Sequence, residues 1–332
     1  MRILYLSDAQ CPDYMSDMLF HGLRRLLGPE VVDVNRLWYM YAHEFGEGRH
    51  DKSKIYGHGF TMHGLLDDDS AVDRTDLRHK VRTRYFDLII YGNILRCQTL
   101  LDEALGLYPQ NRLLFIDGED HPRIAPRLTR HGVYFKRELA ELKPGVWPIQ
   151  FAIPEERIGT VARPKTKTQA FIDPRNRATY IYRDEASYYG DYAESLFGVT
   201  IRKAGWDCLR HYEIMANQCI PNFLGLEQCP MSTMVFLPRT ELYLARCLLE
   251  SRGLEYFETN RGRAEWQALW ERINVIFRRH CTTLALARYV LDVAAGASSR
   301  PGLDSLAAQA ISSPTLPAWT QLRFGKGVNA CF

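Results

Sequence analysis

The chain has 332 residues, of which 46% are hydrophobic and 24% are charged, and its formal net charge is +3. This length suffices for two domains of ordinary size, and the composition is typical of a soluble globular protein. No stretch has the roughly 18 consecutive apolar residues of a transmembrane helix, and the apolar part of the N-terminal MRILYLSD is too short for a signal peptide. The small positive charge does not indicate a nucleic-acid partner.

The eight cysteines are scattered, mostly within apolar segments, and no CxxC pair occurs. This argues for reduced thiols in a cytoplasmic protein, and against both a zinc site and a disulfide framework. We therefore predict a cytoplasmic protein that binds no metal.

The first half of the chain alternates apolar runs with helical patterns. Strands are predicted from apolar runs at 2–6, 31–34, 86–93, 112–120, 132–139 and 146–153, and helices from the spacing of apolar residues at 15–26 and 98–107. Such alternation is typical of a doubly wound parallel sheet. The segment 43–79 has no clear period and is expected to be a long functional or mobile loop.

The second half begins after a polar, proline-containing stretch at 154–168, a predicted interdomain linker. Strands are then predicted at 169–172, 195–201 and 219–223, and helices at 206–217, at 239–251 and around 266–277, before a turn-rich tail from about 296. We therefore expect an N-terminal Rossmann-like domain over 1–153 and a C-terminal Rossmann-like domain with C-terminal helices over 169–332. No GxGxxG follows the first strand and no GxxxxGK[ST] occurs, which disfavours a nicotinamide or flavin enzyme and excludes a P-loop kinase.

The segment KAGWDCLRHYEIMANQCIPNF, residues 203–223, predicts a glycine-containing turn, a helix and a strand. Arg210 and Glu213 are three residues apart and lie on one side of that helix. They form either an exposed ion pair or a ligand site. In the ligand site, Glu213 would accept hydrogen bonds from ribose hydroxyls, while Lys203, Arg210 and the helix N-terminus would neutralise a diphosphate. The place of the helix after a strand, where α/β folds bind ligands, favours the ligand site.

A longer stretch, FGVTIRKAGWDCLRHYEIMANQCIPNF, resembles the donor-site segment of GT-B glycosyltransferases, especially exostosin-like and family-1-like bacterial members. The matching positions are Arg210, Glu213, Ala216, Ile220 and Pro221. The resemblance implies two Rossmann-like domains with a cleft between them, a nucleotide-sugar donor held by the C-terminal half, and Glu213 on the ribose. Many retaining members have a second acid eight positions before this glutamate. Here that donor-site position is Gly205, which favours an inverting transfer.

An inverting transferase needs a base that takes the proton from the acceptor hydroxyl. FIDGEDHPR (115–123) places Glu119 and Asp120 at the C-terminal end of a predicted strand, and Asp8 follows the first predicted strand. We predict that Asp120, Glu119 or Asp8 is the base. The alternatives are an acidic turn that caps a following helix and, for Asp8, an Asx turn.

Other polar segments are less specific. Arg183, within YIYRDEASYYGDY (180–192), is a candidate phosphate ligand, and the surrounding rings either stack on a base or sugar or pack in the core. DDDS (67–70) contains Asp67-x-Asp69, the spacing of a metal-binding pair, but no strand precedes it, so we expect a solvated acidic run. The histidines at 43, 50, 58 and 63 show no metal-ligand spacing and are expected to line a flexible acceptor loop or to face solvent.

These patterns together predict a metal-independent glycosyltransferase that moves a sugar from a nucleotide-activated donor to a hydroxyl of a glycan or glycolipid, as in polysaccharide biosynthesis. No cofactor besides the nucleotide-sugar co-substrate is expected, and peripheral membrane association stays open. Two alternatives remain: another nucleotide-using Rossmann enzyme, such as a methyltransferase, and a non-catalytic nucleotide- or sugar-binding protein of the same fold. A methyltransferase would be expected to have an acidic residue at the end of the second strand. Asn35 and Arg36 follow that predicted strand instead, which argues against this alternative.

Overall fold

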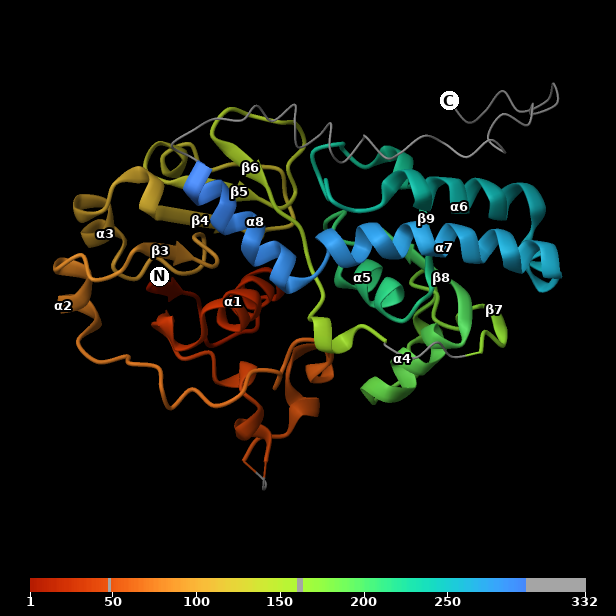
Figure 1. Cartoon of the computed structure of the whole chain (residues 1–332), viewed down its shortest axis with the longest axis horizontal. Coiled ribbons are helices and arrows are strands. Elements are labelled where there is room, and N and C mark those ends of the chain that lie inside the picture. Colours follow the sequence, from red (N-terminus) through yellow and green to blue (C-terminus); the bar gives the residue numbers. More distant parts are fainter. Residues whose placement is uncertain (47–48, 160–163, 297–332) are drawn as a thin grey trace. The chain divides into compact units, whose positions relative to one another are not determined.

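The computed structural model describes residues 1–46, 49–159 and 164–296, which form an α/β protein (Figure 1). Six parallel strands form a sheet in the order β2-β1-β3-β4-β5-β6, and three further strands form a parallel sheet in the order β7-β8-β9. The strands are β1 (Ile3–Leu6), β2 (Val31–Asp33), β3 (Leu88–Tyr91), β4 (Leu113–Asp117), β5 (Val133–Lys136), β6 (Val146–Pro148), β7 (Lys167–Gln169), β8 (Ser195–Ile201) and β9 (Ile220–Leu224).

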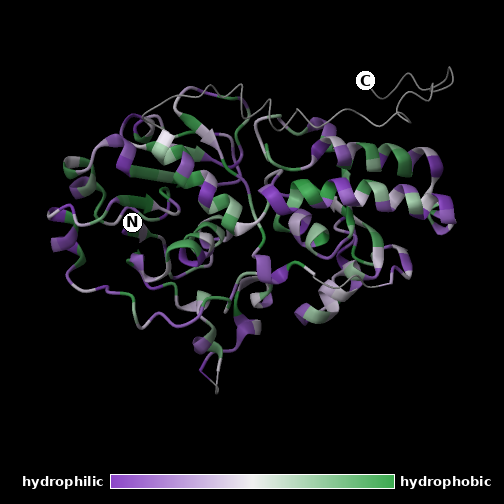
Figure 2. Ribbon diagram, viewed as in Figure 1, coloured by the Kyte–Doolittle hydropathy of each residue, from purple (hydrophilic) through white to green (hydrophobic). Residues whose placement is uncertain are grey.

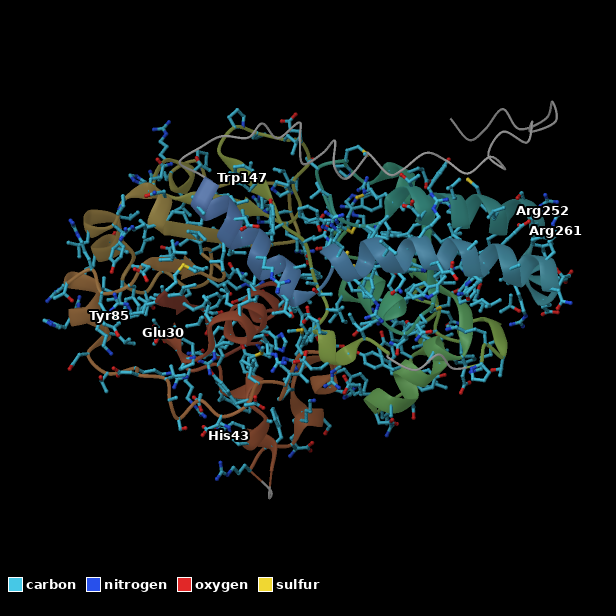
Figure 3. The ribbon with its side chains drawn as sticks, viewed as in Figure 1. Glu30, His43, Tyr85, Trp147, Arg252 and Arg261 are labelled. Carbon is cyan, nitrogen blue, oxygen red and sulfur yellow. The ribbon has the colours of Figure 1, made fainter. Side chains whose placement is uncertain are left out.

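Helices connect these strands and continue after the second sheet. The α-helices are α1 (Tyr14–Leu27), α2 (Leu77–Arg82), α3 (Leu101–Leu107), α4 (Glu185–Ala193), α5 (Leu209–Ala216), α6 (Arg239–Arg252), α7 (Asn260–His280) and α8 (Thr283–Gly296). Arg252 and Arg261, labelled in Figure 3, mark the ends of α6 and α7 that the intervening turn joins. Within the described residues, no helix is both long enough and apolar enough to cross a membrane.

The strands of the first sheet are continuous apolar runs because helices and loops cover both faces of the sheet. Every residue of β1, β3, β4 and β5 is buried, and most residues of this sheet are drawn in hydrophobic colours in Figure 2; the exceptions include the buried pair Asp117 and Lys136 at the ends of β4 and β5. The chain runs from β1 to β2 on one side and then crosses to β3 on the other side of β1. In open parallel sheets, ligands commonly bind at the carboxyl ends of the strands beside such a change of direction.

Helix α8 returns to the first sheet and packs against α1. A Cβ atom added at Gly22 would overlap the carbonyl oxygen of Thr283 and lie 2.6 Å from its carbonyl carbon, so only glycine permits this approach. The chain before α8 is also fixed, because Ile153 N–H donates to Cys281 O (2.9 Å) and Thr283 N–H donates to Ile153 O (3.0 Å).

Most elements lie where the sequence predicts them. Each of the six apolar runs predicted as strands in the first half contains one strand of the six-stranded sheet, and β8 covers the predicted residues 195–201. The strand predicted at 169–172 is present but begins two residues earlier, because β7 spans Lys167–Gln169 and shares only Gln169 with the predicted range. The tail predicted after 296 lies outside the described residues, and the division into domains 1–153 and 169–332 stays a prediction.

The contact at Gly22 predicts a large effect from one methyl group. Gly22→Ala should lower the free energy of unfolding by about 1–3 kcal/mol, because α1 and α8 must move apart. Gly106→Ala is the matched control, since Gly106 is exposed in α3 and an added Cβ there meets nothing within 4 Å. It should be neutral or stabilising by up to about 1 kcal/mol. Denaturant unfolding measures both, and equal midpoints for Gly22→Ala and the wild type would contradict the prediction.

Candidate functional site

The turn between β8 and α5 is held by residues that follow β5 in the first sheet. The carboxylate of Glu138 accepts hydrogen bonds from the backbone N–H groups of Trp206 and Asp207, both at 3.0 Å. Arg137, which is only 1% exposed, donates to the carbonyl of Asp207 at 2.6 Å. Charge-assisted hydrogen bonds of this kind are stronger than neutral ones, so they fix where α5 begins.

The side chain of Asp207 anchors the same turn from the inside. Its carboxylate accepts from Phe151 N–H (2.6 Å) and from the Tyr212 hydroxyl (2.8 Å). Burial raises the pKa of Asp207 to about 7, although the Arg137 guanidinium opposes the shift. Because it accepts from the backbone N–H of Phe151, which ties the turn to a distant segment, we assign Asp207 to the framework of the site.

Gly205 lies where the first sheet touches this turn. A Cβ atom there would lie 2.5 Å from Glu138 Oε1 and 3.0 Å from Asp120 Oδ1. The missing side chain thus lets two carboxylates approach the turn. The structure therefore brings Asp120 and Gly205, both predicted site residues, next to each other.

Arg210, in the first turn of α5, is a buried cation with unused hydrogen-bonding capacity. It is 8% exposed, and one terminal nitrogen donates to the Tyr180 hydroxyl at 2.6 Å. Its Nε and other terminal nitrogen have no hydrogen-bond partner among the described residues. Lys203 lies over the same Tyr180 ring, 5.6 Å from its centre, and partial burial together with Arg210 lowers the pKa of Lys203. Two neighbouring cations that form no ion pair with a described carboxylate favour an anionic ligand.

Glu213, one turn further along α5, is a buried acceptor of hydroxyl hydrogen bonds. It is 7% exposed, and its two oxygens accept from the Thr61 and Tyr188 hydroxyls, both at 2.6 Å. Burial raises the pKa of Glu213, whereas these two hydrogen bonds lower it. The alternative of an exposed Arg210–Glu213 ion pair is therefore wrong, since both side chains are buried and each binds a tyrosine instead.

The three predicted bases differ in their environments. The Asp120 side chain is 54% exposed and pairs with Arg137. Glu119 is partly buried, which raises its pKa, but hydrogen bonds from Arg96 (2.7 Å) and Asn93 (3.1 Å) outweigh this and leave its pKa lowered.

Asp8 forms a local hydrogen bond within its own turn. It accepts from the backbone N–H of Gln10 at 3.0 Å, which is the Asx turn considered as its alternative role. Arg183 is exposed in the turn before α4. Neither side chain joins the buried group around Arg210 and Glu213.

Sequence reasoning missed a buried histidine two residues after Thr61, whose hydroxyl donates to Glu213. The expectation that His63 faces solvent is wrong, because His63 is 0% exposed and its Nε2 lies 4.0 Å from Asp17 Oδ2. Neither ring nitrogen has a hydrogen-bond partner among the described residues. Burial, with a smaller effect of Lys52, lowers the pKa of His63 to about 4, so the ring is neutral at pH 7. The sequence signal that could have indicated burial of His63 was the apolar residue next to it, Met62, which is also buried.

The expectation of a solvated acidic run at 67–70 is wrong for Asp69. Asp69 is 6% exposed and pairs with Arg36 (2.7 Å) and Arg74 (2.9 Å). These arginines already neutralise its carboxylate. His43, labelled in Figure 3, lies near this carboxylate, with Nε2 3.6 Å from Asp69 Oδ1.

Among the residues that the structure describes, two groups of side chains are close enough to share a cation: His21 with Glu155 and Glu156, and His43 with Asp68 and Asp69. In each group an arginine already contacts a carboxylate. Arg25 lies 3.2 Å from Glu156, and Arg36 pairs with Asp69. The absence of a metal requirement stays a prediction.

A cavity of about 420 Å³ lies elsewhere, where α7 ends and α8 begins. The residues that line it are Glu155, Ile158, Arg278, Arg279, Thr282, Leu284, Ala285 and Arg288. None of the predicted site residues lines this cavity. The site around Glu213 is instead closed by the Thr61 and Tyr188 side chains.

The raised pKa of Asp207 predicts how this turn affects stability. Between about pH 4 and pH 7 the unfolded chain has lost the proton that the native state still holds, so the Asp207 contribution to stability falls as the pH rises. Asp207→Asn lacks this titration, so its stability should not fall in the same way. The free energy of unfolding of Asp207→Asn minus that of the wild type should therefore increase from about pH 4 to pH 7. Denaturant unfolding at several pH values measures it, with Asp76→Asn, at an exposed position, as the control for losing one charge. A difference that stays constant with pH would contradict the prediction.

Comparison with known proteins identifies no family for this chain. A scan against models of known protein families finds no match, and a search of curated proteins finds no similar sequence. The function is therefore argued from the chemistry of the residues at the start of α5 and at the carboxyl edge of the first sheet.

Proposed function

We propose that the protein is a glycosyltransferase of the GT-B class, and that it binds the nucleotide of an activated sugar at the start of α5. One observation carries the proposal: Glu213 is a buried carboxylate that accepts two hydroxyl hydrogen bonds, and it lies one helical turn from the buried cation Arg210, which shares the Tyr180 ring with Lys203. A nucleoside diphosphate presents ribose hydroxyls and a diphosphate, the two groups that these side chains suit. The two parallel sheets are compatible with a GT-B fold.

In this proposal Glu213 accepts hydrogen bonds from the ribose, and Arg210 and Lys203 face the diphosphate. Tyr180 and Ile181 are 44% and 57% exposed and offer an apolar surface beside the cations. Aromatic rings with a polar tip are suited to stacking on a base while donating at the edge. Arg183 stays a candidate phosphate ligand because its exposed side chain lies on the same segment.

We propose a direct displacement as the reaction. A base takes the proton of the acceptor hydroxyl as its oxygen attacks the anomeric carbon, and the bond from that carbon to the diphosphate breaks with inversion. The charge that develops on the diphosphate is stabilised by Arg210 and Lys203. Of the predicted bases we favour Asp120, because its carboxylate is exposed and lies beside the Gly205 turn. Glu119 is the weaker base, since its pKa is lowered.

Two alternatives make different predictions for the same site. A methyltransferase would bind S-adenosylmethionine in preference to nucleotides. A non-catalytic binding protein would bind a nucleotide or sugar without turnover, and loss of each candidate base would leave it unchanged. A glycan or glycolipid acceptor, a role in polysaccharide biosynthesis and a cytoplasmic location are part of the same proposal.

The donor site predicts a specific binding defect. Glu213→Ala should weaken nucleotide binding by about 1–3 kcal/mol, the scale of a hydrogen bond to a charged group. Calorimetric titration with UDP, GDP, CMP, dTDP and S-adenosylmethionine measures this. Glu258→Ala is the matched control, because the exposed Glu258 also accepts from a threonine hydroxyl, that of Thr168 at 3.2 Å. Equal nucleotide affinity of Glu213→Ala and wild type would contradict the proposal.

The assignment of the base predicts loss of turnover without loss of binding. Asp120→Asn should lower the rate of nucleotide release from the sugar donor by about 10²–10⁴-fold, the usual contribution of a general base, with nucleotide affinity unchanged. Glu119→Gln, Asp8→Asn and His63→Gln are compared in the same assay, with melting temperatures as the check on folding. Retained turnover in Asp120→Asn, with loss in one of the others, would move the role to that residue.

A further inference from the structure

Thr61 is held by polar contacts at every one of its polar atoms. Its N–H donates to Glu185 Oε1 at 2.6 Å, and its carbonyl accepts from Arg157 Nε at 3.1 Å. Its single hydroxyl hydrogen is donated to Glu213 Oε1 at 2.6 Å, so the Tyr189 hydroxyl, 2.5 Å away, donates to Thr61 Oγ1. Thr61 belongs to the segment 43–79, whereas all four partners lie beyond residue 150.

The backbone of Thr61 is unfavourable for its residue type. Its φ is +70°, in the left-handed region, where a β-branched residue is a genuine outlier. Such a conformation persists only when surrounding contacts impose it, and it is typical of functional and switching sites. Gly57, Gly59 and Gly64 on either side also have positive φ, which glycine adopts readily.

The carboxylate that Thr61 contacts has no free space for a ligand. Glu213 is 7% exposed, and its second oxygen is taken by Tyr188. A ribose hydroxyl that donates to Glu213 Oε1 needs the place that the Thr61 hydroxyl now fills.

We propose that Thr61 is a built-in occupant of the nucleotide site, which takes the position of a ribose hydroxyl on Glu213 and must be displaced when the nucleotide binds. This inference rests on the proposed function, because it requires that Glu213 bind the ribose. The exchange is chemically matched, since one hydroxyl donor replaces another, and it releases the strained backbone of Thr61. Only molecules in which Thr61 has left the Glu213 carboxylate can bind the nucleotide. The apparent affinity is therefore the intrinsic affinity multiplied by the fraction of such molecules.

The test compares two substitutions of Thr61. Thr61→Val keeps the shape and β-branching but loses the hydrogen bond that holds residue 61 on Glu213, so residue 61 should leave the carboxylate more often and the variant should bind its nucleotide about tenfold tighter than wild type. Thr61→Ser keeps the hydroxyl and should stay within about twofold of wild type. Titration with UDP, GDP, CMP and dTDP gives the affinities, and melting temperatures show that both variants are folded.

Hydrogen exchange on the unmodified protein gives a second measurement. Amides of residues 56–66 should lose protection when the nucleotide binds, and increased protection there would overturn the inference. If Thr61→Val binds no tighter than wild type while Glu213→Ala abolishes binding, the donor site stands and the role of Thr61 is wrong. If no nucleotide binds to wild type or to Thr61→Val, the proposed function itself is wrong and this inference fails with it.

Discussion

The hydrogen bonds of Glu138 to the backbone N–H groups of residues 206 and 207 decide where α5 begins, and with it where Arg210 and Glu213 lie. A carboxylate 5% exposed is stable there only because Arg137 pairs with it at 3.0 Å. Buried ion pairs of this kind contribute little net stability, since desolvation offsets the attraction. Their main effect is on geometry. Removing either partner would leave the other charge buried without a counter-ion, so the two side chains must stay together. The first sheet thereby positions a helix that belongs to the second.

Arg210 and His63 depart from the usual rule that buried polar groups are satisfied. Among the described residues, Arg210 keeps two nitrogens without a hydrogen-bond partner, and so does His63. Thr61, two residues before His63, has a strained backbone. None of these features increases stability, and each is expensive to maintain in a folded protein. Under the proposed function, ligand binding would account for the features at Arg210 and at Thr61, whose hydroxyl donates to Glu213.

The sequence predicts the elements well where the signal is local. Continuous apolar runs located the strands of the first sheet, because parallel strands are buried on both faces. Helix α5, predicted from residue 206, begins at Leu209, because the turn before it is fixed by Glu138. No local pattern contains that partner, which lies 68 residues away from Trp206.

The sequence predicted the candidate-site residues Arg210 and Glu213, but it did not predict that their side chains are buried. The spacing of Arg210 and Glu213 places them on one side of a helix, but spacing does not tell whether that side faces water. The segment that contains Thr61 and His63 has no hydrophobic period, since its order comes from contacts with distant residues such as Asp17 and Glu185. Hydrophobic periodicity identifies amphipathic helices and strands. It does not identify irregular segments, because these are held in place by tertiary contacts and have no period.

Two tyrosines keep the opposite charges on α5 apart. Neighbouring side chains at this spacing, about 5–6 Å between Cβ atoms, often form ion pairs. Here the Tyr180 hydroxyl binds Arg210 and the Tyr188 hydroxyl binds Glu213. A direct ion pair would have to be broken before a ligand could use either group, whereas a neutral hydroxyl is replaced by a ligand hydroxyl at little cost. The guanidinium also keeps its full charge for an anion. In the proposed function, the neutral partners on both ions would be displaced by a hydroxyl and an anion of the same ligand.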